Sequence, residues 1–198
     1  MPTGKKIEDM STKSKQRTNW LEVWERKASE ETGDLKKLNG HEKTSIDPQE
    51  LASLISSKLN IQKSDRVLEV GAGAGMIAQY LDCNYVGTDY SKNMCDKHTD
   101  ILGNKMFCCE ANKLPFEDNQ FDKVFAFSVF HYFPNQKYAS EAAQEMLRVA
   151  KEAVFIGDLP LTSHDSDHLL YDKEQWSDWD ILDGYFRDSR FNIFKGVV

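Results

Sequence analysis

The sequence predicts a doubly wound α/β domain built on a mostly parallel sheet. From Arg66 onward, short apolar runs alternate with stretches of helical periodicity, which is the pattern of strands joined by crossover helices. The chain has 198 residues, of which 40% are hydrophobic, enough to bury one compact core. The last two apolar runs are separated only by the short segment 184–188, which predicts an antiparallel hairpin closing the sheet.

The N-terminal part predicts a covering segment in front of this sheet. Residues 1–15 are rich in Lys, Ser, Thr and Gly, so we expect them to be disordered. We assign 16–198 to a single domain, with 16–45 as an N-terminal lid region. Trp20 and Trp24 lie on the apolar stripe of a short amphipathic helix, which must dock on something. They either pack against the edge of the sheet or belong to a mobile lid over a ligand.

A second helix is predicted over residues 45–60. Asp47 suits its N-cap, and Pro48 suits the first helical position, where the missing N–H does no harm. Apolar side chains recur at helical spacing along it, namely Leu51, Leu54, Ile55 and Leu59.

Strands and helices then alternate. The predicted strands are 66–70, 84–89, 105–110, 122–128 and 153–158, followed by 176–183 and 189–198. Between them, helical periodicity marks 75–82, 91–98 and 138–151.

Charge and cysteine content exclude several classes of function. Lys and Arg number 25 against 32 Asp and Glu, and the resulting net charge of −7 disfavours nucleic acid as a partner. No apolar stretch reaches the roughly 18 residues of a membrane span, so we expect no membrane partner. The four cysteines lack CxxC spacing and fit reduced thiols in the cytoplasm. The oligomeric state is left open.

A glycine-rich loop follows the first strand. The strand ends in Glu69, and Gly71, Gly73 and Gly75 then let the backbone turn tightly and a ligand approach the main chain at the start of a helix. The dinucleotide fingerprint would place a glycine where this chain has Met76.

The second strand supplies a partner for this loop. Asp89 ends that strand 18 residues after Gly71, where a carboxylate can bind both hydroxyls of a ribose. Loop and carboxylate together predict an adenosine-containing ligand in the crevice at the strand ends.

These elements, from Ile61 to Asp158, resemble the class I S-adenosylmethionine-dependent methyltransferases, in the branch acting mostly on small molecules. The resemblance implies a Rossmann-like seven-stranded sheet whose last strand is antiparallel. It also implies S-adenosylmethionine as cofactor and S-adenosylhomocysteine as product. The residues that would contact the cofactor through the methionine part are Glu69, Gly71, Ala72, Gly73, Gly75 and Ser128, and those that would contact its adenosine are Asp89, Tyr90, Glu110 and Ala111. Many members have Asp in place of Glu110.

The transfer itself demands mainly positioning, because the acceptor atom attacks the methyl carbon in line. His131, just beyond the fourth strand, is the candidate base or orienting group, and a packed histidine is the alternative. Asp158, at the end of the fifth strand, is the second catalytic candidate, and a carboxylate capping a turn is its alternative. His41 could also reach the site from the lid region.

No metal is expected. His164 and His168 are four residues apart, but their Ser- and Asp-rich surroundings indicate a solvated loop. The predicted function is methyl transfer to an oxygen or nitrogen atom of a small polar metabolite, such as a sugar derivative or a small phosphorylated or amino compound. The alternatives are an NAD-dependent oxidoreductase and a non-catalytic module that binds an adenosyl ligand.

Overall fold

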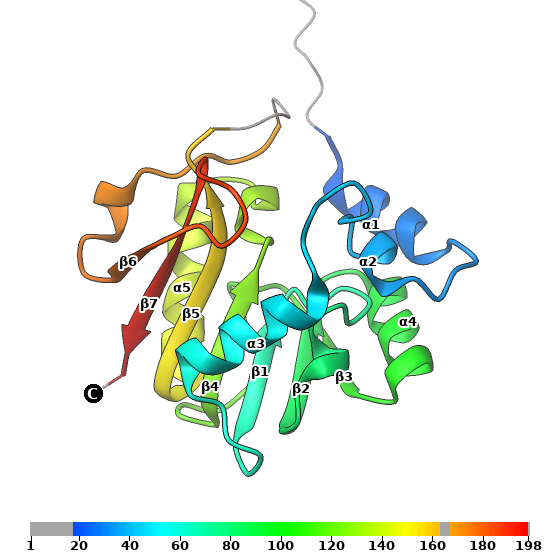
Figure 1. The fold of residues 1–198 in the computed structure, drawn as a ribbon, viewed down its shortest axis with the longest axis horizontal. Coiled ribbons are helices and arrows are strands. Elements are labelled where there is room, and N and C mark those ends of the chain that lie inside the picture. The colour runs from blue at the N-terminus through cyan, green and yellow to red at the C-terminus, as the bar shows by residue number, and fades with distance from the viewer. Residues whose placement is uncertain (1–17, 163–166, 198) are drawn as a thin grey trace, which may run out of the picture.

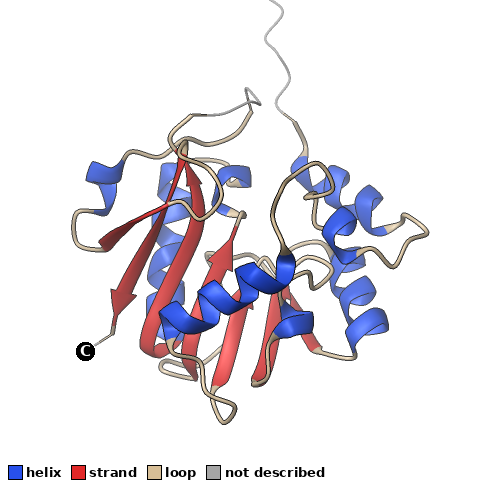
Figure 2. Ribbon diagram, viewed as in Figure 1, coloured by secondary structure: helices blue, strands red, loops and turns tan. Residues whose placement is uncertain are grey.

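The computed structural model describes residues 18–162 and 167–197, so the disorder predicted for 1–15 lies outside the described part. One seven-stranded sheet forms its centre, with helices on both faces (Figures 1 and 2). The strands are β1 (Arg66–Val70), β2 (Asn84–Asp89), β3 (Lys105–Cys108), β4 (Phe121–Phe127), β5 (Ala150–Pro160), β6 (Asp180–Asp183) and β7 (Arg190–Gly196).

The strand order is β3-β2-β1-β4-β5-β7-β6. Strands β1 to β5 pair in parallel, whereas β7 runs antiparallel to both β5 and β6. The predicted doubly wound sheet, its antiparallel last strand and the closing hairpin are therefore confirmed. Because the order reverses between β1 and β4, the carboxyl ends of these two strands flank the crevice where open α/β sheets bind ligands.

Helices cover the two faces of the sheet. They are α1 (Trp20–Ala28), α2 (Leu35–Leu38), α3 (Pro48–Leu59), α4 (Lys92–Leu102) and α5 (Gln136–Val149), with 3₁₀ turns η1 (Ala78–Tyr80), η2 (Phe130–Tyr132) and η3 (Lys173–Trp176). In Figure 1, α3 crosses the front of the sheet and α5 lies behind it. Each side has its own apolar core, one built around α5 and one that includes α2, α3 and Met94 of α4.

Helix α3 begins as predicted. The Asp47 side chain accepts hydrogen bonds from the backbone N–H groups of Gln49 at 2.8 Å and Glu50 at 3.1 Å, and Pro48 occupies the first turn. The helix ends at Asn60, which adopts the left-handed conformation with φ of 50°.

The helix predicted over 75–82 is wrong, because only the 3₁₀ turn η1 forms there. After the glycine loop, 71–75, just eight residues, 76–83, lead back to the start of β2 at the opposite edge. They must retrace a five-residue strand of about 16 Å. Eight helical residues would rise only about 12 Å, so the connection has to be more extended. Consequently no α-helix N-terminus stands behind the glycine loop.

The segment between β5 and β6 carries no α-helix in its described part. Residues 163–166 are outside the description, and η3 is the regular element found from 167 to β6. Among all described residues, no helix is long and apolar enough to cross a membrane.

A candidate ligand site at the carboxyl ends of the strands

A cavity of about 530 Å³ lies at the carboxyl ends of β1, β2 and β4, roofed by residues 18–45, which we call the lid. Its size is typical of small-molecule sites. We call the lining residues Asp89, Tyr90, Cys109, Glu110 and Ala111 the β2 end. We call the lining residues Trp20, Trp24, His41, Phe127 and Tyr132 the lid end. The glycine loop also lines the cavity, through Gly71 and Gly73.

The glycine loop is held close to its neighbours by main-chain contacts. Gly71 has φ of +74°, and its N–H, with that of Ala72, donates to the carbonyl of Thr88 at 2.8 and 2.9 Å. A Cβ on Gly71 would lie 2.5 Å from a methyl group of Val129. Glycine is thus required there for both conformation and space. Gly71 and Gly73 line the cavity, whereas Ala72 and Gly75 do not appear in its lining.

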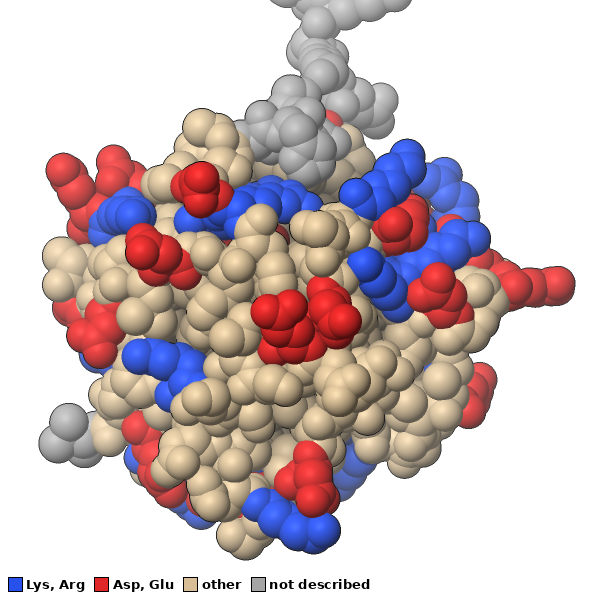
Figure 3. Space-filling model, viewed as in Figure 1, with Lys and Arg blue, Asp and Glu red and all other residues tan. Residues whose placement is uncertain are grey.

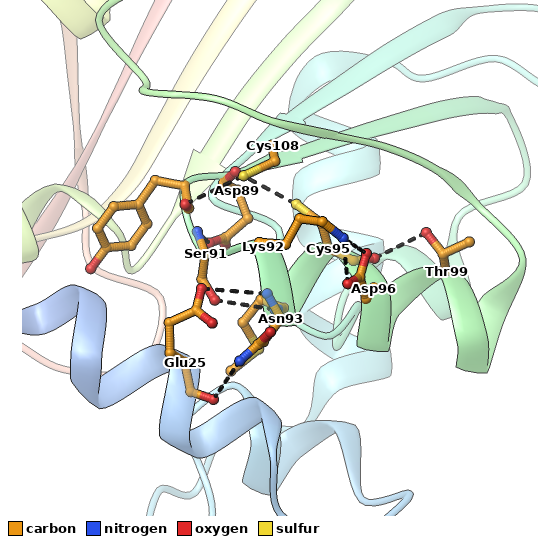
Figure 4. A network of polar contacts seen from close by, with 11 residues as sticks. Glu25, Asp89, Ser91, Lys92, Asn93, Cys95, Asp96, Thr99 and Cys108 are labelled. Atoms are coloured by element: carbon orange, nitrogen blue, oxygen red, sulfur yellow. Dashed lines mark hydrogen bonds and ion pairs between the residues drawn. The ribbon is translucent and has the colours of Figure 1, made fainter.

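Asp89 ties the loop to the start of α4. One carboxylate oxygen accepts from the Gly73 N–H at 3.0 Å, and the other accepts from the Ser91 N–H at 2.9 Å. Burial raises its pKa to about 6. Since a carboxylate offers about four lone-pair sites, it can still accept two ribose hydroxyls. Figure 4 shows Asp89 beside Ser91, close to where Asn93 contacts Glu25 of the lid.

Glu69 lies beneath the loop and also lines the cavity. Its side chain is buried and accepts a hydrogen bond from the Tyr85 hydroxyl at 2.7 Å. Burial raises the pKa of this carboxyl to about 8, so much of it is protonated near neutral pH. A neutral carboxyl can donate as well as accept, unlike the ionised acid.

The predicted adenine contacts all line the β2 end. The Tyr90 hydroxyl is buried and has no hydrogen-bond partner within the described residues. Glu110 accepts from the Tyr138 hydroxyl, and that hydroxyl accepts from the Ala111 N–H at 3.1 Å. Tyr138 of α5 was not anticipated from the sequence. It engages one carboxylate oxygen of Glu110 and the Ala111 N–H, whereas the buried Tyr90 hydroxyl has no partner in the described part of the chain.

Ser128 and Asp158 form a strained pair at the ends of β4 and β5. Both adopt positive φ, at 58° and 64°, and the Ser128 hydroxyl donates to the Asp158 carboxylate at 2.8 Å. Arg190 holds the other side of Asp158, with Nε 3.8 Å from a carboxylate oxygen. Such strain persists where the surroundings impose it, as they do here. Ser128 lines the cavity, but Asp158 lies one layer behind it.

His131 also lies behind the lining. Its buried ring packs against Tyr132, with ring centroids 4.1 Å apart, and against His168, at 4.7 Å. Tyr132 separates it from the lid end. The catalytic roles of His131 and Asp158 stay predictions, and any direct contact with a ligand would need rearrangement of Tyr132 or Ser128. His164 lies outside the described residues, within which no cluster of His, Cys, Asp or Glu could hold a metal.

The lid contributes Asn39, which the sequence patterns did not assign to the site, together with Trp20, Trp24 and His41, for which they left that role open. The Asn39 amide donates to the Ala72 carbonyl and accepts from the Ala74 N–H, both at 3.1 Å. Trp20 and Trp24 contact the Tyr132 ring, with centroids 4.7 and 5.2 Å away. The sequence signal that could have indicated Asn39 is the Asn-Gly pair at the end of α2, because such a pair ends a helix with a turn of fixed geometry.

Comparisons with known proteins agree with this geometry. Residues 68–156 match the family model described as a methyltransferase domain. The chain is 32% identical over 133 residues to the protein MJ1123 of Methanocaldococcus jannaschii, covering 67% of this chain and 60% of that protein. It is also 32% identical over 97 residues to the sterol 24-C-methyltransferase ERG6 of Saccharomyces cerevisiae, covering 40% of this chain and 24% of the enzyme.

Residues 68–156 therefore form a methyltransferase domain, and the chain resembles the class I S-adenosylmethionine-dependent methyltransferases. Its fold is similar to that of the magnesium protoporphyrin IX methyltransferase of Synechocystis PCC 6803, solved with bound S-adenosylmethionine, at a TM-score of 0.62 and 13% identity. That similarity covers 92% of this chain and 93% of the other. The chain spans less than two thirds of the length of each of these two curated relatives.

The cavity suits S-adenosylmethionine, the cofactor that the resemblance implies. The glycine loop gives close main-chain approach where a Cβ would collide with Val129, and Asp89 offers a carboxylate to a ribose. The buried Tyr90 hydroxyl, unsatisfied within the described chain, can be met by an adenine or ribose group. An NAD-dependent oxidoreductase is disfavoured, because the matched domain is a methyltransferase and Met76 replaces the further glycine of the dinucleotide loop.

Proposed function

We propose that this chain transfers the methyl group of S-adenosylmethionine to an oxygen or nitrogen atom of a small molecule. The observation that carries the proposal is the two-ended cavity, with an adenosine-type site at the β2 end and an aromatic site at the lid end. When bound, the cofactor supplies a sulfonium methyl, whose bond to sulfur breaks with the electron pair left on sulfur. The acceptor lone pair forms the new bond to carbon, and any proton on the acceptor passes to solvent or a base.

The protein's contribution is to orient the reactants and exclude water. The glycine loop, Asp89 and Tyr90 bind the cofactor from one side, and Ser128, fixed by Asp158 and Arg190, borders the passage to the lid end. The lid closes the cavity over this passage, held to the loop by Asn39. Positioning of this kind can supply a large part of the rate acceleration. His131 packs against the Tyr132 ring and so fixes its position, and through that ring it positions the acceptor.

The lining of the lid end refines the kind of acceptor. Four aromatic rings and one imidazole surround it, those of Trp20, Trp24, Phe127, Tyr132 and His41. Aromatic side chains offer a ligand large apolar contact area and carry no positive charge for a phosphate. We therefore propose an acceptor whose attacked atom is carried by a ring or an apolar chain, in preference to the phosphorylated compound that the sequence also allowed.

Charge and thiol state support the proposed setting of the enzyme. On the face shown in Figure 3, basic and acidic side chains are interspersed and form no large basic patch of the kind that binds nucleic acid. All four cysteines are free thiols. We propose a cytoplasmic enzyme of one domain, 16–198, with 16–45 as its lid.

Calorimetric titration tests the proposal. We expect the protein to bind S-adenosylhomocysteine with micromolar affinity and NAD far more weakly, with binding lost in Asp89→Ala. A thermal melt of the variant checks that it is folded, and Tyr90→Phe is a milder second variant. Absence of S-adenosylhomocysteine binding, or preferential binding of NAD, would overturn the proposal. Cofactor binding without transfer to any acceptor in a screen with labelled methyl donor would favour the non-catalytic module.

A further inference from the structure

Two buried polar groups of the lid have no hydrogen-bond partner within the described chain, and both belong to residues that line the cavity. They are Nδ1 of His41, whose side chain is 8% exposed, and Nε1 of Trp20. Buried polar atoms in native proteins are almost always satisfied, so each exception calls for a partner that is missing. The cofactor contacts proposed above lie at the β2 end, whereas these two groups lie at the lid end.

The turn after α2 fixes the position of His41. The His41 N–H donates to the Lys36 carbonyl and the Gly40 N–H donates to the Lys37 carbonyl, each at 2.9 Å. With Gly40 at φ of +76°, this is a Schellman turn. A Cβ on Gly40 would approach Trp24 to 3.0 Å. The turn thus directs Asn39 onto the glycine loop and the next-but-one residue, His41, toward the lid end.

The surroundings of His41 combine flat apolar walls with positive charge. Its ring centroid lies 6.4 Å from that of Phe127. Burial is the main cause that lowers the pKa of His41 to about 4, and the charges of Arg187, Lys36 and Arg190 lower it further against the opposing effect of Glu42. The imidazole is therefore neutral at physiological pH.

A neutral imidazole in a positive environment discriminates between acceptors. It can exchange hydrogen bonds with a hydroxyl or carboxylate oxygen. An ammonium group would meet unfavourable charge there, and it has no lone pair until a base removes its proton. An imidazole with so low a proton affinity is a poor base for that step. The acidic groups that line the cavity, Glu69, Asp89 and Glu110, lie at the glycine loop and the β2 end.

We propose that His41 is an acceptor-binding residue, which holds the oxygen atom of an uncharged or anionic aromatic acceptor in the lid end, with the Trp20 N–H as a second donor. This inference rests on the proposed function and narrows it from an oxygen or nitrogen acceptor to an oxygen acceptor.

Three ring compounds of matched size test it, namely benzyl alcohol, benzoate and benzylamine. Each is titrated to about 10 mM, where a fragment of this size should bind, into the full chain saturated with S-adenosylhomocysteine. Binding is followed by ligand-observed NMR and by the indole N–H signals, assigned with Trp20→Phe and Trp176→Phe. Trp176 is a matched internal control, since its Nε1 is also buried without a partner in the described part but it does not line the cavity.

We expect at least one oxygen compound to bind and to shift the Trp20 signal but not the Trp176 signal, with benzylamine at least tenfold weaker. His41→Phe, which keeps a flat ring, should weaken oxygen-compound binding at least tenfold and leave S-adenosylhomocysteine affinity within about twofold. His41→Gln should restore part of it. The inference is overturned if no compound binds, if benzylamine binds best, or if His41→Phe changes nothing. Because cofactor binding is measured separately, failure of the proposed function would appear as absent S-adenosylhomocysteine binding.

Discussion

The β2 end and the lid end of the cavity are built in different ways. At the β2 end, backbone groups at the ends of paired strands hold the site, as where Gly71 and Ala72 donate to the Thr88 carbonyl and Asp89 accepts from Gly73. At the lid end, side chains from a segment before the sheet are laid over it, and Asn39 makes the direct polar contacts to the loop.

This difference has a physical consequence for the two halves. At the β2 end, strand pairing fixes the backbone positions, so a substitution that adds atoms there cannot be relieved by a small backbone shift. The lid depends on a few side-chain contacts and one short turn, so it can open and its residues can vary with the acceptor. Substitutions in the two regions should therefore differ in how much stability they cost and in which ligand they weaken, the cofactor or the acceptor.

The largest effect is expected from Gly71→Ala. The added Cβ would collide with Val129 and occupy a left-handed conformation, so we expect a loss of about 2–4 kcal/mol in unfolding free energy. Affinity for S-adenosylhomocysteine should fall at least a hundredfold. Gly103→Ala is the matched control, since Gly103 has nearly the same φ, +71°, but nothing within 4 Å of the added atom. Its cost should be about 1 kcal/mol, with cofactor affinity unchanged. If Gly71→Ala and Gly103→Ala lowered the unfolding free energy equally in urea, the collision with Val129 would not be the cause of the loss.

Glu69→Gln should give the next largest effect, and it is a gain in stability at high pH. The folded pKa of about 8 lies above the ordinary value of 4.5, so the folded state holds a proton that the unfolded state releases. Stability from this group is therefore lost as pH rises from about 4.5 to 8. At pH 8 we expect the variant to be about 2–4 kcal/mol more stable than the wild type, and at pH 5 nearly equal to it.

Urea unfolding at the two pH values checks this result. Asp89, with its pKa raised to about 6, contributes a drop of the same sign between about pH 4 and 6, which remains in the variant. A variant that lost stability at both pH values would show that the Glu69 carboxyl is stabilising in its ionised form.

Asn39→Ala should have a moderate effect that falls on the lid. Loss of two hydrogen bonds to the glycine loop should cost about 1–2 kcal/mol and weaken S-adenosylhomocysteine binding about tenfold. Hydrogen exchange should become faster at the Ala74 amide, which donates to Asn39. Asn93→Ala is the control, because the Asn93 amide also contacts the lid, donating to the Glu25 carbonyl, but at 3.4 Å and outside the cavity lining. Equal changes in both variants would show that cofactor affinity depends on docking of the whole lid and not on the Asn39 contacts to the glycine loop.

The smallest effect is expected from Ser128→Gly. Glycine removes the strain of the positive φ, worth about 1 kcal/mol, while the lost hydrogen bond to Asp158 costs about the same. The unfolding free energy should therefore change by less than about 1 kcal/mol. Ser128→Ala keeps the strain and loses the bond, so it should be the less stable of the two. The opposite order in thermal unfolding would show that the backbone at Ser128 is relaxed.

The sequence predicted most elements of the sheet because each strand is a local apolar run bounded by turn residues. The bounds of β1 and β2 agree with the prediction, and Asp47 caps α3 as expected. The helix over 75–82 was wrong because its periodicity was local, whereas the distance that the connection must span is set by the sheet. The sequence places His131 and Asp158 at strand ends, but their neighbours Tyr132 and Ser128 line the cavity and they do not.

What the sequence by itself determined is which residues gather at the carboxyl ends of β1 and β2. Glu69, the glycines and Asp89 lie at the ends of consecutive strands, and parallel pairing brings such ends together whatever the rest of the chain does. Only the tertiary structure decided the lid end. His41 lies near Phe127 of β4 and Trp20 packs against Tyr132, in both cases across more than eighty residues of sequence. No local pattern encodes which face of a docked helix or turn will line a cavity. That contact depends on packing the lid against Tyr132 and the loop, which is a property of the whole fold.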